Sequence, residues 1–325
     1  MLKELAAVCE TLTYCNSDFT IQPCLATEWE QIDDCTWQFK LREGVTFHDG
    51  TPMNAEAVKW SLDRAIGLNA SFVGYTDVAA VEVVDEYTVN IKTNNPNTEV
   101  PQAMCYVGGA IIAPSSVDAD GNFILPVGTG YFKAVEFDEA SSTFTCEAYD
   151  GYWDEVETSV TKRMIVSMPD ASARSLALQN GEVDIVADIP FSDLQMLKDD
   201  ENVVVEQFNT ARVYHYEYNC ASGPMTDVNV RKAVAYALNK EEIVNDILLG
   251  VGGVPEGIMM ADMPWTNTEV DVYAYNPEKA VELLKEAGYE DTDGDGIVDK
   301  DGENLCIDII TLQSQIGRAS CRERV

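Results

Sequence analysis

Long apolar runs and basic residues are scarce in this sequence of 325 residues. No run reaches the roughly 18 consecutive apolar residues that a membrane-spanning helix needs. Only 21 Lys and Arg residues stand against 56 Asp and Glu residues, which gives a formal net charge of −35 at pH 7. Because charge of this sign repels nucleic-acid phosphates and anionic lipids, the sequence predicts no membrane span and no nucleic-acid partner.

Common catalytic and redox motifs are also absent. The sequence has no GxSxG, HExxH or P-loop pattern, and its nine cysteines include no CxxC pair. These absences argue against a serine hydrolase, a zinc peptidase, a nucleotide hydrolase and a thioredoxin-type protein. Gly128-Thr129-Gly130 lacks the third glycine of a dinucleotide-binding loop. We therefore expect no catalytic residues, and we expect buried thiols, with disulfides left open as the alternative.

The two ends of the sequence need separate treatment. The apolar stretch in "MLKELAAVC" is too short for a signal peptide, and its faint likeness to a lipoprotein cleavage site is left as an alternative. The last ten residues, 316–325, place three arginines in an otherwise acidic chain. We interpret this segment as a translated sequencing-adapter artefact and exclude it from the fold prediction, the alternative being a natural basic tail.

Hydrophobic patterning in the first half predicts strands and one long helix, in a chain long enough for about two domains. From Cys35 to Gly44, apolar and polar residues alternate as in a half-buried strand. Asn54 is placed to cap the helix that follows. Residues 81–93 predict a hairpin, and the stretches 126–137 and 142–153 predict two further strands.

In the second half, helical and strand patterns alternate, which is typical of α/β layers. Asp227, Asn239 and Asn276 each stand where a side chain can cap a helix. The alternating segments are helix 170–181, strand 183–189, helix 192–200 and strand 203–208.

Taken in order, these segments resemble the extracytoplasmic solute-binding proteins of ABC importers, specifically family 5, which binds oligopeptides, dipeptides and nickel complexes. The likeness covers nearly the whole chain to Gln315, and several of its stretches are long and collinear. The matching stretches are "LATEWEQIDDCTWQFKLREGVTFHDGTPMNAEAVKWSL", "PVGTGYFKAVEF", "YDGYWD", "ALQNGEVDI", "DVNVRKAVAYALNKEEIV", "YNPEKAVELLKEAGY" and "DTDGDGIVDKDGENL".

The resemblance implies an α/β fold of two lobes, the type II periplasmic-binding-protein fold, with an extra domain inserted near its start. The family's secretion signal, its first strand and most of its second lobe have no match here. We therefore expect a fragment truncated at both ends. The implied domains are lobe I at residues 1–26 and 121–209, the inserted domain at 27–120, and the start of lobe II at 210–315.

The resemblance also implies a function, which is binding and not catalysis. We expect a monomer that captures di- or oligopeptides outside the cytoplasmic membrane, in the periplasm or lipid-anchored on the outer face. It would deliver them to the membrane subunits of an ABC permease and require no cofactor. A nickel or metallophore binder of the same family is the first alternative, because "MPWTNTEVDVYAYNPEKA" has some likeness to such proteins. A secreted calcium-dependent enzyme or scaffold is the alternative from another class.

The segment "RVYHYEYN" holds the main candidates for ligand binding, because on the family's plan the chain passes there from the first lobe to the second. In an alternating strand, Tyr214, Tyr216 and Tyr218 would share one face. Aromatic faces and hydrogen-bonding groups are what a reversible binding site needs. A core strand with buried tyrosines is the structural alternative.

Three further residues complete the candidate site. Asn219 is a candidate ligand contact or the end of the strand, and Tyr106 in "MCYVGG" is a second aromatic candidate. His215 favours nickel as the ligand, because imidazole binds that metal well. The alternative for His215 is a packed or solvent-facing ring.

His48 stands beside Asp49 in the turn "FHDGTP", an arrangement that invites a catalytic interpretation. No nucleophile motif accompanies the pair, and the resemblance implies that this turn, a part of the inserted domain, lies away from the ligand cleft. We interpret His48 as a turn residue that forms local hydrogen bonds.

The segment "DTDGDGIVDKDG" resembles the calcium-binding loop of an EF-hand. Asp291, Asp293, Asp295 and Asp299 occupy positions one, three, five and nine of such a loop. Gly302 stands at position twelve, where a bidentate glutamate is expected. The sequence therefore leaves two alternatives, a weak structural calcium site and a metal-free acidic turn.

Overall fold

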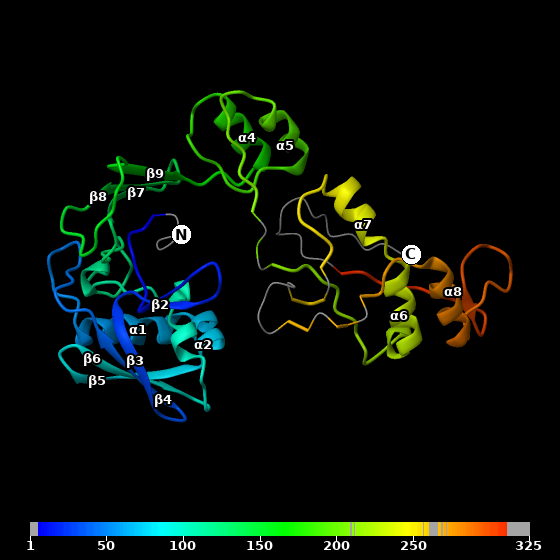
Figure 1. The fold of residues 1–325 in the computed structure, drawn as a ribbon, viewed down its shortest axis with the longest axis horizontal. Helices are drawn as coiled ribbons and strands as arrows, with labels where there is room; N and C mark the ends of the chain where they lie inside the picture. Colours follow the sequence, from blue (N-terminus) through cyan, green and yellow to red (C-terminus); the bar gives the residue numbers. More distant parts are fainter. Residues whose placement is uncertain are drawn as a thin grey trace. The chain divides into compact units, whose positions relative to one another are not determined.

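The computed structural model describes residues 6–208, 210, 212–255, 257–259, 266–267, 269–270 and 272–310. The chain divides into two compact units, Met1–Ser167 and Met168–Val325, here called the first and the second unit (Figure 1). Within the described residues, no helix has both the length and the apolar character needed to cross a membrane. The division into two lobes and an inserted domain stays a prediction.

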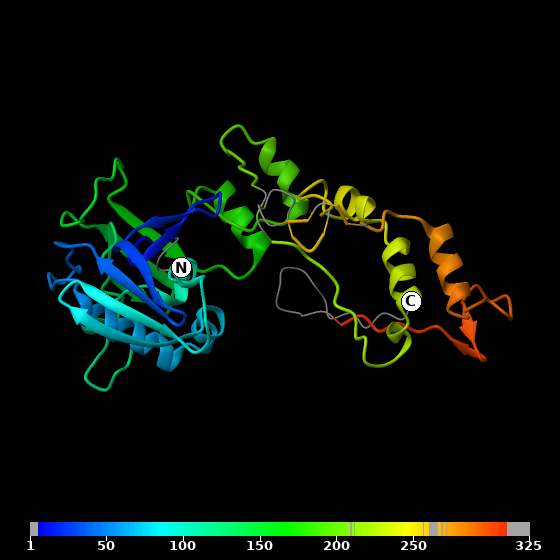
Figure 2. The same cartoon turned by 60° about the horizontal axis from the view of Figure 1, so that its bottom comes forward.

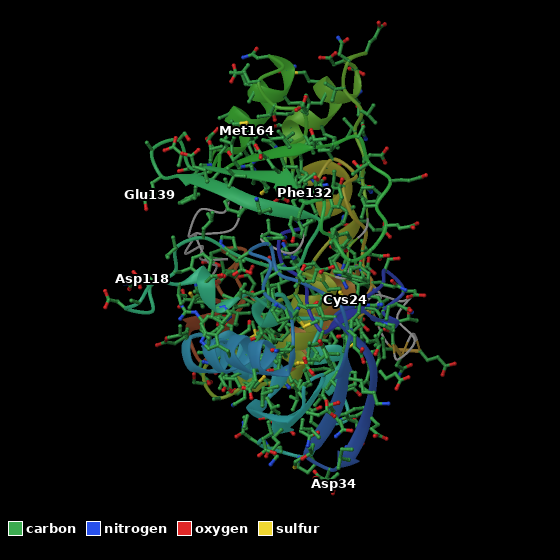
Figure 3. The ribbon with its side chains drawn as sticks, turned by 90° about the vertical axis from the view of Figure 1, so that its left-hand side faces the viewer. Cys24, Asp34, Asp118, Phe132, Glu139 and Met164 are labelled. Carbon is green, nitrogen blue, oxygen red and sulfur yellow. The ribbon has the colours of Figure 1, made fainter. Side chains whose placement is uncertain are left out.

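A four-stranded antiparallel sheet forms the main part of the first unit, with the strand order β3-β4-β6-β5. The predicted alternation around Trp37 and Phe39 falls in β4, where Phe39 and Leu41 are buried. The hairpin that joins β3 to β4 has Asp34 at its tip (Figure 3). The strands are β3 (Ala26–Asp33), β4 (Thr36–Leu41), β5 (Val78–Asp85) and β6 (Thr88–Thr93).

Two helices pack beside this sheet. Helix α1 (Ala55–Leu68) begins at Asn54, whose side chain accepts a hydrogen bond of 3.0 Å from the Ala57 N–H, as the sequence predicts. Asn69 ends α1 and also caps α2 (Ala70–Thr76), because its Oδ1 accepts a hydrogen bond from the Phe72 N–H. The buried face of α1 includes Val58 and Leu62, so its apolar stripe contributes to the main core.

A second sheet in the first unit contains β7 (Phe132–Asp138), β8 (Thr143–Ala148) and β9 (Lys162–Val166), paired in that order. Phe132, on β7, and Cys146, on β8, are buried in a core of their own; Figure 3 labels Phe132, and Glu139 just after β7.

The N-terminal segment joins this second core beside two glycines. The Gly130 N–H donates to the Val8 carbonyl at 3.0 Å, and the Phe132 N–H donates to the Ala7 carbonyl at 3.1 Å. A Cβ atom at Gly128 would lie 2.0 Å from the Val8 carbonyl oxygen, and one at Gly130 would lie 2.2 Å from the Ala7 oxygen. Only glycine allows the two backbones to approach this closely.

Short elements complete the first unit. Thr13 connects two of them, because its hydroxyl donates to the Pro101 carbonyl at 2.7 Å. The elements are β1 (Thr13–Cys15), β2 (Ile21–Pro23), α3 (Val100–Ala103), and the 3₁₀ turns η1 (Val107–Gly109) and η2 (Pro114–Ser116).

The regular elements of the second unit are mainly helices. Helices α6 and α8 lie side by side (Figures 1 and 2) and share a small cluster of Ala233, Ala280 and Leu283. The Asn276 side chain caps α8 by accepting a hydrogen bond from the Lys279 N–H, which confirms the predicted start. The elements are α4 (Ala171–Gln179), α5 (Phe191–Lys198), η3 (Pro224–Thr226), α6 (Val228–Ala237), α7 (Lys240–Glu242), the π-helix η4 (Ile243–Ile247), α8 (Pro277–Glu286), β10 (Asp299–Lys300) and β11 (Glu303–Asn304).

Helices α4 and α6 begin in the same way. Asp170 and Asp227 cap them, and an arginine four residues later donates to the backbone carbonyls that precede the cap. The Arg174 Nη1 donates to the Met168 carbonyl at 2.6 Å, and the Arg231 Nη1 donates to the Met225 carbonyl at 2.7 Å. Each arginine thus ties the first turn of its helix to the chain that leads into it.

Three predicted strands do not form. Residues 183–189, 203–208 and 212–219 have no strand assignment in the structure. A strand is stabilised by the backbone hydrogen bonds and the burial that a neighbouring strand supplies. Ile185 is 87% exposed, so this apolar residue lacks that burial here. The predicted α/β alternation of the second unit is therefore wrong in its strands and right in its helices.

Candidate functional site

Tyr214 and Tyr216 lie on the surface of the second unit, each with more than half of its side chain exposed. Tyr218 is partly buried and packs against the cluster of Met225 and Val230, which anchors the segment. Because the segment is irregular, the predicted strand face shared by the three tyrosines does not exist. Exposed aromatic rings of this kind can nevertheless serve as platforms for a ligand.

His215 and Asn219 make contacts within their own segment. The His215 Nε2 lies 3.5 Å from a carboxylate oxygen of Glu217. The Asn219 amide nitrogen donates to the Ser222 hydroxyl at 3.1 Å, and its carbonyl oxygen accepts from the Ala221 N–H at 3.1 Å. Asn219 therefore shapes a turn after the aromatic segment.

Tyr106 belongs to the first unit, whereas the other four candidate ligand residues belong to the second. It precedes η1 and is partly buried against the main core. Its ring lies beside that of Tyr75, with a centroid separation of 5.2 Å. Sequence reasoning missed Tyr75, because no local pattern indicates that a residue of α2 meets one 31 positions later.

His48 makes long-range contacts, so the prediction of local hydrogen bonds is wrong. Its Nδ1 accepts a hydrogen bond from the Gly128 N–H at 3.3 Å, and its Nε2 lies 2.8 Å from the Gly130 carbonyl oxygen. These partners require a neutral imidazole with its proton on Nε2. Burial lowers the pKa of His48, in agreement with that state. The side chain thus joins two distant segments of the chain.

Glu10 is the second residue that sequence reasoning missed, and it forms the centre of a half-buried polar cluster. Its carboxylate accepts hydrogen bonds from the Thr129 hydroxyl at 2.7 Å, the Tyr152 hydroxyl at 2.9 Å and the Trp153 indole N–H at 2.8 Å. Burial raises the pKa of Glu10 above its ordinary value, and the hydrogen bonds, that from Trp153 first, oppose the rise. With three donors committed, this carboxylate fixes distant segments to one another.

Two thiols of the first unit, those of Cys9 and Cys146, are not activated nucleophiles. Cys9 and Cys146 are buried, and burial raises their pKa values to about 12 and about 11. Both thiols are therefore protonated at neutral pH and unreactive. The expectation of buried thiols is confirmed for these two residues alone among the described cysteines. The other four of the first unit are half-buried, and Cys220 and Cys306 of the second unit are exposed.

Three of the four aspartates in the acidic loop come together. Asp291, Asp293 and Asp295 each place a carboxylate oxygen within 4.8 Å of the others, and all three are exposed. The Asp291 carboxylate also accepts hydrogen bonds from the Gly294 and Gly296 N–H groups. Oxygen ligands in this arrangement are of the kind that calcium prefers.

Asp299 does not join that group. It is 7% exposed, and its carboxylate accepts hydrogen bonds from the N–H and the hydroxyl of Thr292. These bonds lower the pKa of Asp299, that from the Thr292 backbone first. Asp299 thus holds the loop closed, and the predicted four-carboxylate set is reduced to three.

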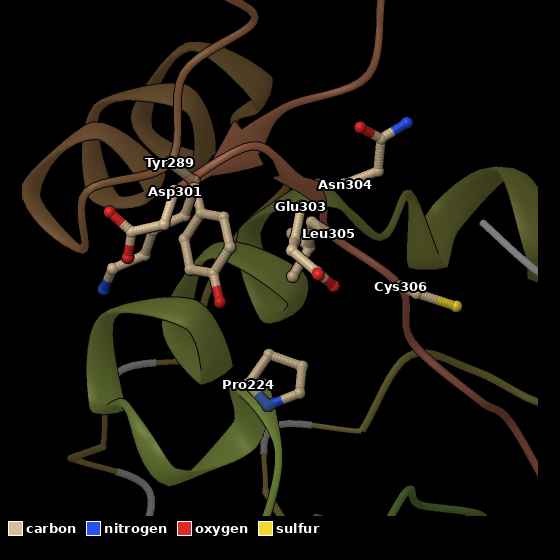
Figure 4. Close-up of a pocket in the computed structure, with 8 residues that line it drawn as sticks. Pro224, Tyr289, Asp301, Glu303, Asn304, Leu305 and Cys306 are labelled. Atoms are coloured by element: carbon tan, nitrogen blue, oxygen red, sulfur yellow. The ribbon is translucent and has the colours of Figure 1, made fainter.

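A shallow pocket of about 370 Å³ lies beside the β10–β11 hairpin, separate from every predicted ligand residue (Figure 4). Tyr289, Pro224 and Leu305 give it apolar walls, and Glu303 adds a carboxylate. The Lys300 ammonium donates to the Ala287 carbonyl at 2.7 Å beside the Tyr289 ring.

Comparison with known proteins supports the resemblance. Residues 20–316 match the family described as bacterial extracellular solute-binding proteins, family 5 Middle. The chain is 28% identical over 296 residues to a dipeptide-binding protein of Escherichia coli (strain K12). This alignment covers 82% of this chain and 55% of that protein. The chain thus spans about half the length of the curated relatives it matches.

Two solved structures are similar to this fold. NikA from Brucella suis, in complex with Fe(III)-EDTA, has a TM-score of 0.79 at 26% identity, covering 92% of this chain and 62% of that one. A nickel ABC transporter structure from Bacillus halodurans has a TM-score of 0.74 at 34% identity, covering 92% of this chain and 61% of that one. Both likenesses extend over the two units of the chain.

Proposed function

From the premise that the chain belongs to the family 5 bacterial extracellular solute-binding proteins, we propose that it captures small peptides for an ABC importer. The observation that carries the proposal is the family match over residues 20–316, together with the likeness to a dipeptide-binding protein. In this proposal the protein works as a monomer outside the cytoplasmic membrane and delivers its solute to the permease subunits.

The geometry supports reversible binding rather than catalysis. Glu10 and His48 are both held by several hydrogen bonds, and the buried thiols are protonated. Tyr214 and Tyr216 offer exposed aromatic surface for the solute, and Tyr106 offers a further ring. We assign these tyrosines to contacts with the peptide, and Asn219 to the turn that positions the segment.

The proposal is tested on the protein expressed from its complete gene. Thermal unfolding is measured with a dipeptide library, and hits are titrated by calorimetry. We expect a higher melting temperature with selected dipeptides, because a ligand that binds only the folded state stabilises it. The Tyr214→Ala and Tyr216→Ala variants should bind more weakly with unchanged melting temperatures when free. No shift with any dipeptide would contradict the proposal.

A nickel complex is the second candidate solute. The likeness to a nickel ABC transporter at 34% identity favours it, and His215 is a partly exposed imidazole. The test is a calorimetric titration with nickel alone and with nickel plus free histidine. Binding that the His215→Ala variant loses would establish this candidate, and binding of dipeptides alone would reject it.

Calcium at the Asp291, Asp293 and Asp295 group is proposed as a structural ligand and not as a participant in solute binding. Millimolar calcium should raise the melting temperature of the unaltered protein and leave that of Asp293→Asn unchanged. No shift at millimolar calcium would reject the site. Loss of peptide binding on chelation would instead favour the calcium-dependent enzyme or scaffold.

A further inference from the structure

Tyr75 is the most exposed large apolar side chain of the first unit, at 76%, among the residues that the structure describes. It lies on α2, whose Phe72 and Thr76 are buried and hold the helix to the core. Its ring is 5.2 Å from that of Tyr106, with an angle of 49° between the planes. One exposed apolar residue needs no explanation, but two aromatic rings presented together form a surface suited to a ligand.

The position of this pair is set by rigid backbone. A Cβ atom at Gly108 would lie 2.7 Å from the Tyr106 ring and 2.9 Å from the Asn69 amide nitrogen. Asn69 is the residue that ends α1 and caps α2. The Tyr106 ring is therefore packed closely between η1 and the corner of the two helices. A ring held in this way loses little conformational entropy when a ligand binds.

The two chain segments that carry the pair are uncharged in a strongly acidic chain, although Asp77 and Glu99 flank them. Residues 65–76 and 100–117 contain no Asp, Glu, Lys or Arg, although 24% of the whole chain is charged. Leu68 and Val107, in the same two segments, add exposed apolar side chains. A charged group in contact with the two rings would lose water without gaining a partner from them, whereas an apolar group would gain contact area.

We propose that Tyr75 and Tyr106 together hold an uncharged, apolar side chain of the solute, which makes Tyr75 a specificity-determining residue. The proposal rests on the proposed function, because it names the part of the peptide that this pair selects. It also predicts that peptides with an aromatic or aliphatic side chain bind more tightly than those with a charged one.

The test compares Tyr75→Ala with the unaltered protein expressed from its complete gene, by calorimetric titration with Ala-Phe, Phe-Ala, Ala-Ala and Ala-Lys. We expect about tenfold weaker binding of whichever phenylalanine peptide binds better, and less than about twofold change for Ala-Ala, from the usual strength of an aromatic contact. Tyr75→Phe should restore the affinity, because the ring and not the hydroxyl makes the contact. The melting temperatures of the free variants should be unchanged, since Tyr75 is exposed.

Phe137→Ala provides the matched control, because Phe137 is an exposed aromatic residue of the same unit on β7. It should bind every peptide as the unaltered protein does. An equal effect of Tyr75→Ala on all four peptides, or no effect on any, would overturn the inference and leave the proposed function intact. If the unaltered protein binds none of them, the proposed function fails and the inference fails with it.

Discussion

The first unit has a main core of twenty buried residues, whereas the two core clusters described in the second unit contain three buried residues each. The first unit also pairs its long strands into antiparallel sheets. The described strands of the second unit form only one hairpin, in which each strand is two residues long. Both units nevertheless contain well-capped helices. The difference teaches that caps suffice to define helices locally, while strands and cores depend on distant parts of the chain.

The largest expected effect is that of Gly128→Ala in the first unit. The new Cβ would lie 2.0 Å from the Val8 carbonyl oxygen, so the N-terminal segment would have to move away from the second sheet. We expect the free energy of unfolding to fall by more than about 4 kcal/mol. Gly67→Ala in α1 is the control, because nothing lies within 4 Å of its Cβ position. It should be neutral or stabilising by up to about 1 kcal/mol in urea denaturation.

Truncation of one buried side chain in each unit would sharpen the comparison of the cores. Phe39→Ala removes a fully buried ring from the main core and should cost about 4 kcal/mol. Leu283→Ala, in the small α6–α8 cluster, should cost about 2 kcal/mol, because a small core can relax around the cavity. Equal losses of unfolding free energy for the two variants in urea denaturation would contradict the inferred difference between the two cores.

The pH dependence of the free energy of unfolding should reveal the contribution of the contacts between His48 and the segment of Gly128 and Gly130. Burial lowers the pKa of His48 in the folded state, so the unfolded state binds the proton more readily. The contribution of His48 is therefore fully present above its unfolded pKa of 6.5 and is lost as the pH falls through the lower folded value.

His48→Gln should cost about 1 kcal/mol at pH 7.5, where its hydrogen bonds to Gly128 and Gly130 are lost or weakened. The difference in the free energy of unfolding between this variant and the unaltered protein should be smaller at pH 5, as measured by urea denaturation at both pH values. A difference in the free energy of unfolding that is constant with pH would mean that His48 has the same pKa in the folded and unfolded states, and would contradict the lowering by burial. The affinity for the solute should be unchanged.

The smallest expected effects are those of the matching helix caps. Asp170→Ala and Asp227→Ala should each destabilise a helix of the second unit by about 1 kcal/mol, because each removes a hydrogen bond to a free N–H group. Hydrogen exchange of the amides in α4 and α6 would measure both changes. An unaffected α6 would show that packing against α8, and not its cap, sets the stability of that helix.

Local features of the fold were predictable from the sequence. Asn54, Asp227 and Asn276 all cap helices as expected, because a cap depends on residues within one turn. The hairpin at residues 81–93 was predictable for the same reason, although β5 begins three residues earlier. The strands at residues 183–189 and 203–208 were not, because a strand forms only when a partner pairs with it.

The candidate site was less predictable than the fold. Residue type alone pointed to Tyr106, Tyr214 and the acidic loop, and their roles as ligand contacts stay predictions. The contact between Tyr75 and Tyr106, and the engagement of Asp299 by Thr292, depend on how the chain folds back on itself. Such three-dimensional relations leave no signal in the local sequence.

The central claim is that this protein holds a peptide reversibly and returns it unaltered. The most direct measurement saturates the protein expressed from its complete gene with a dipeptide, removes the unbound peptide, and identifies by mass spectrometry what denaturation releases. The account predicts one equivalent of unchanged dipeptide per protein molecule. Release of free amino acids, or of no peptide at all, would contradict it.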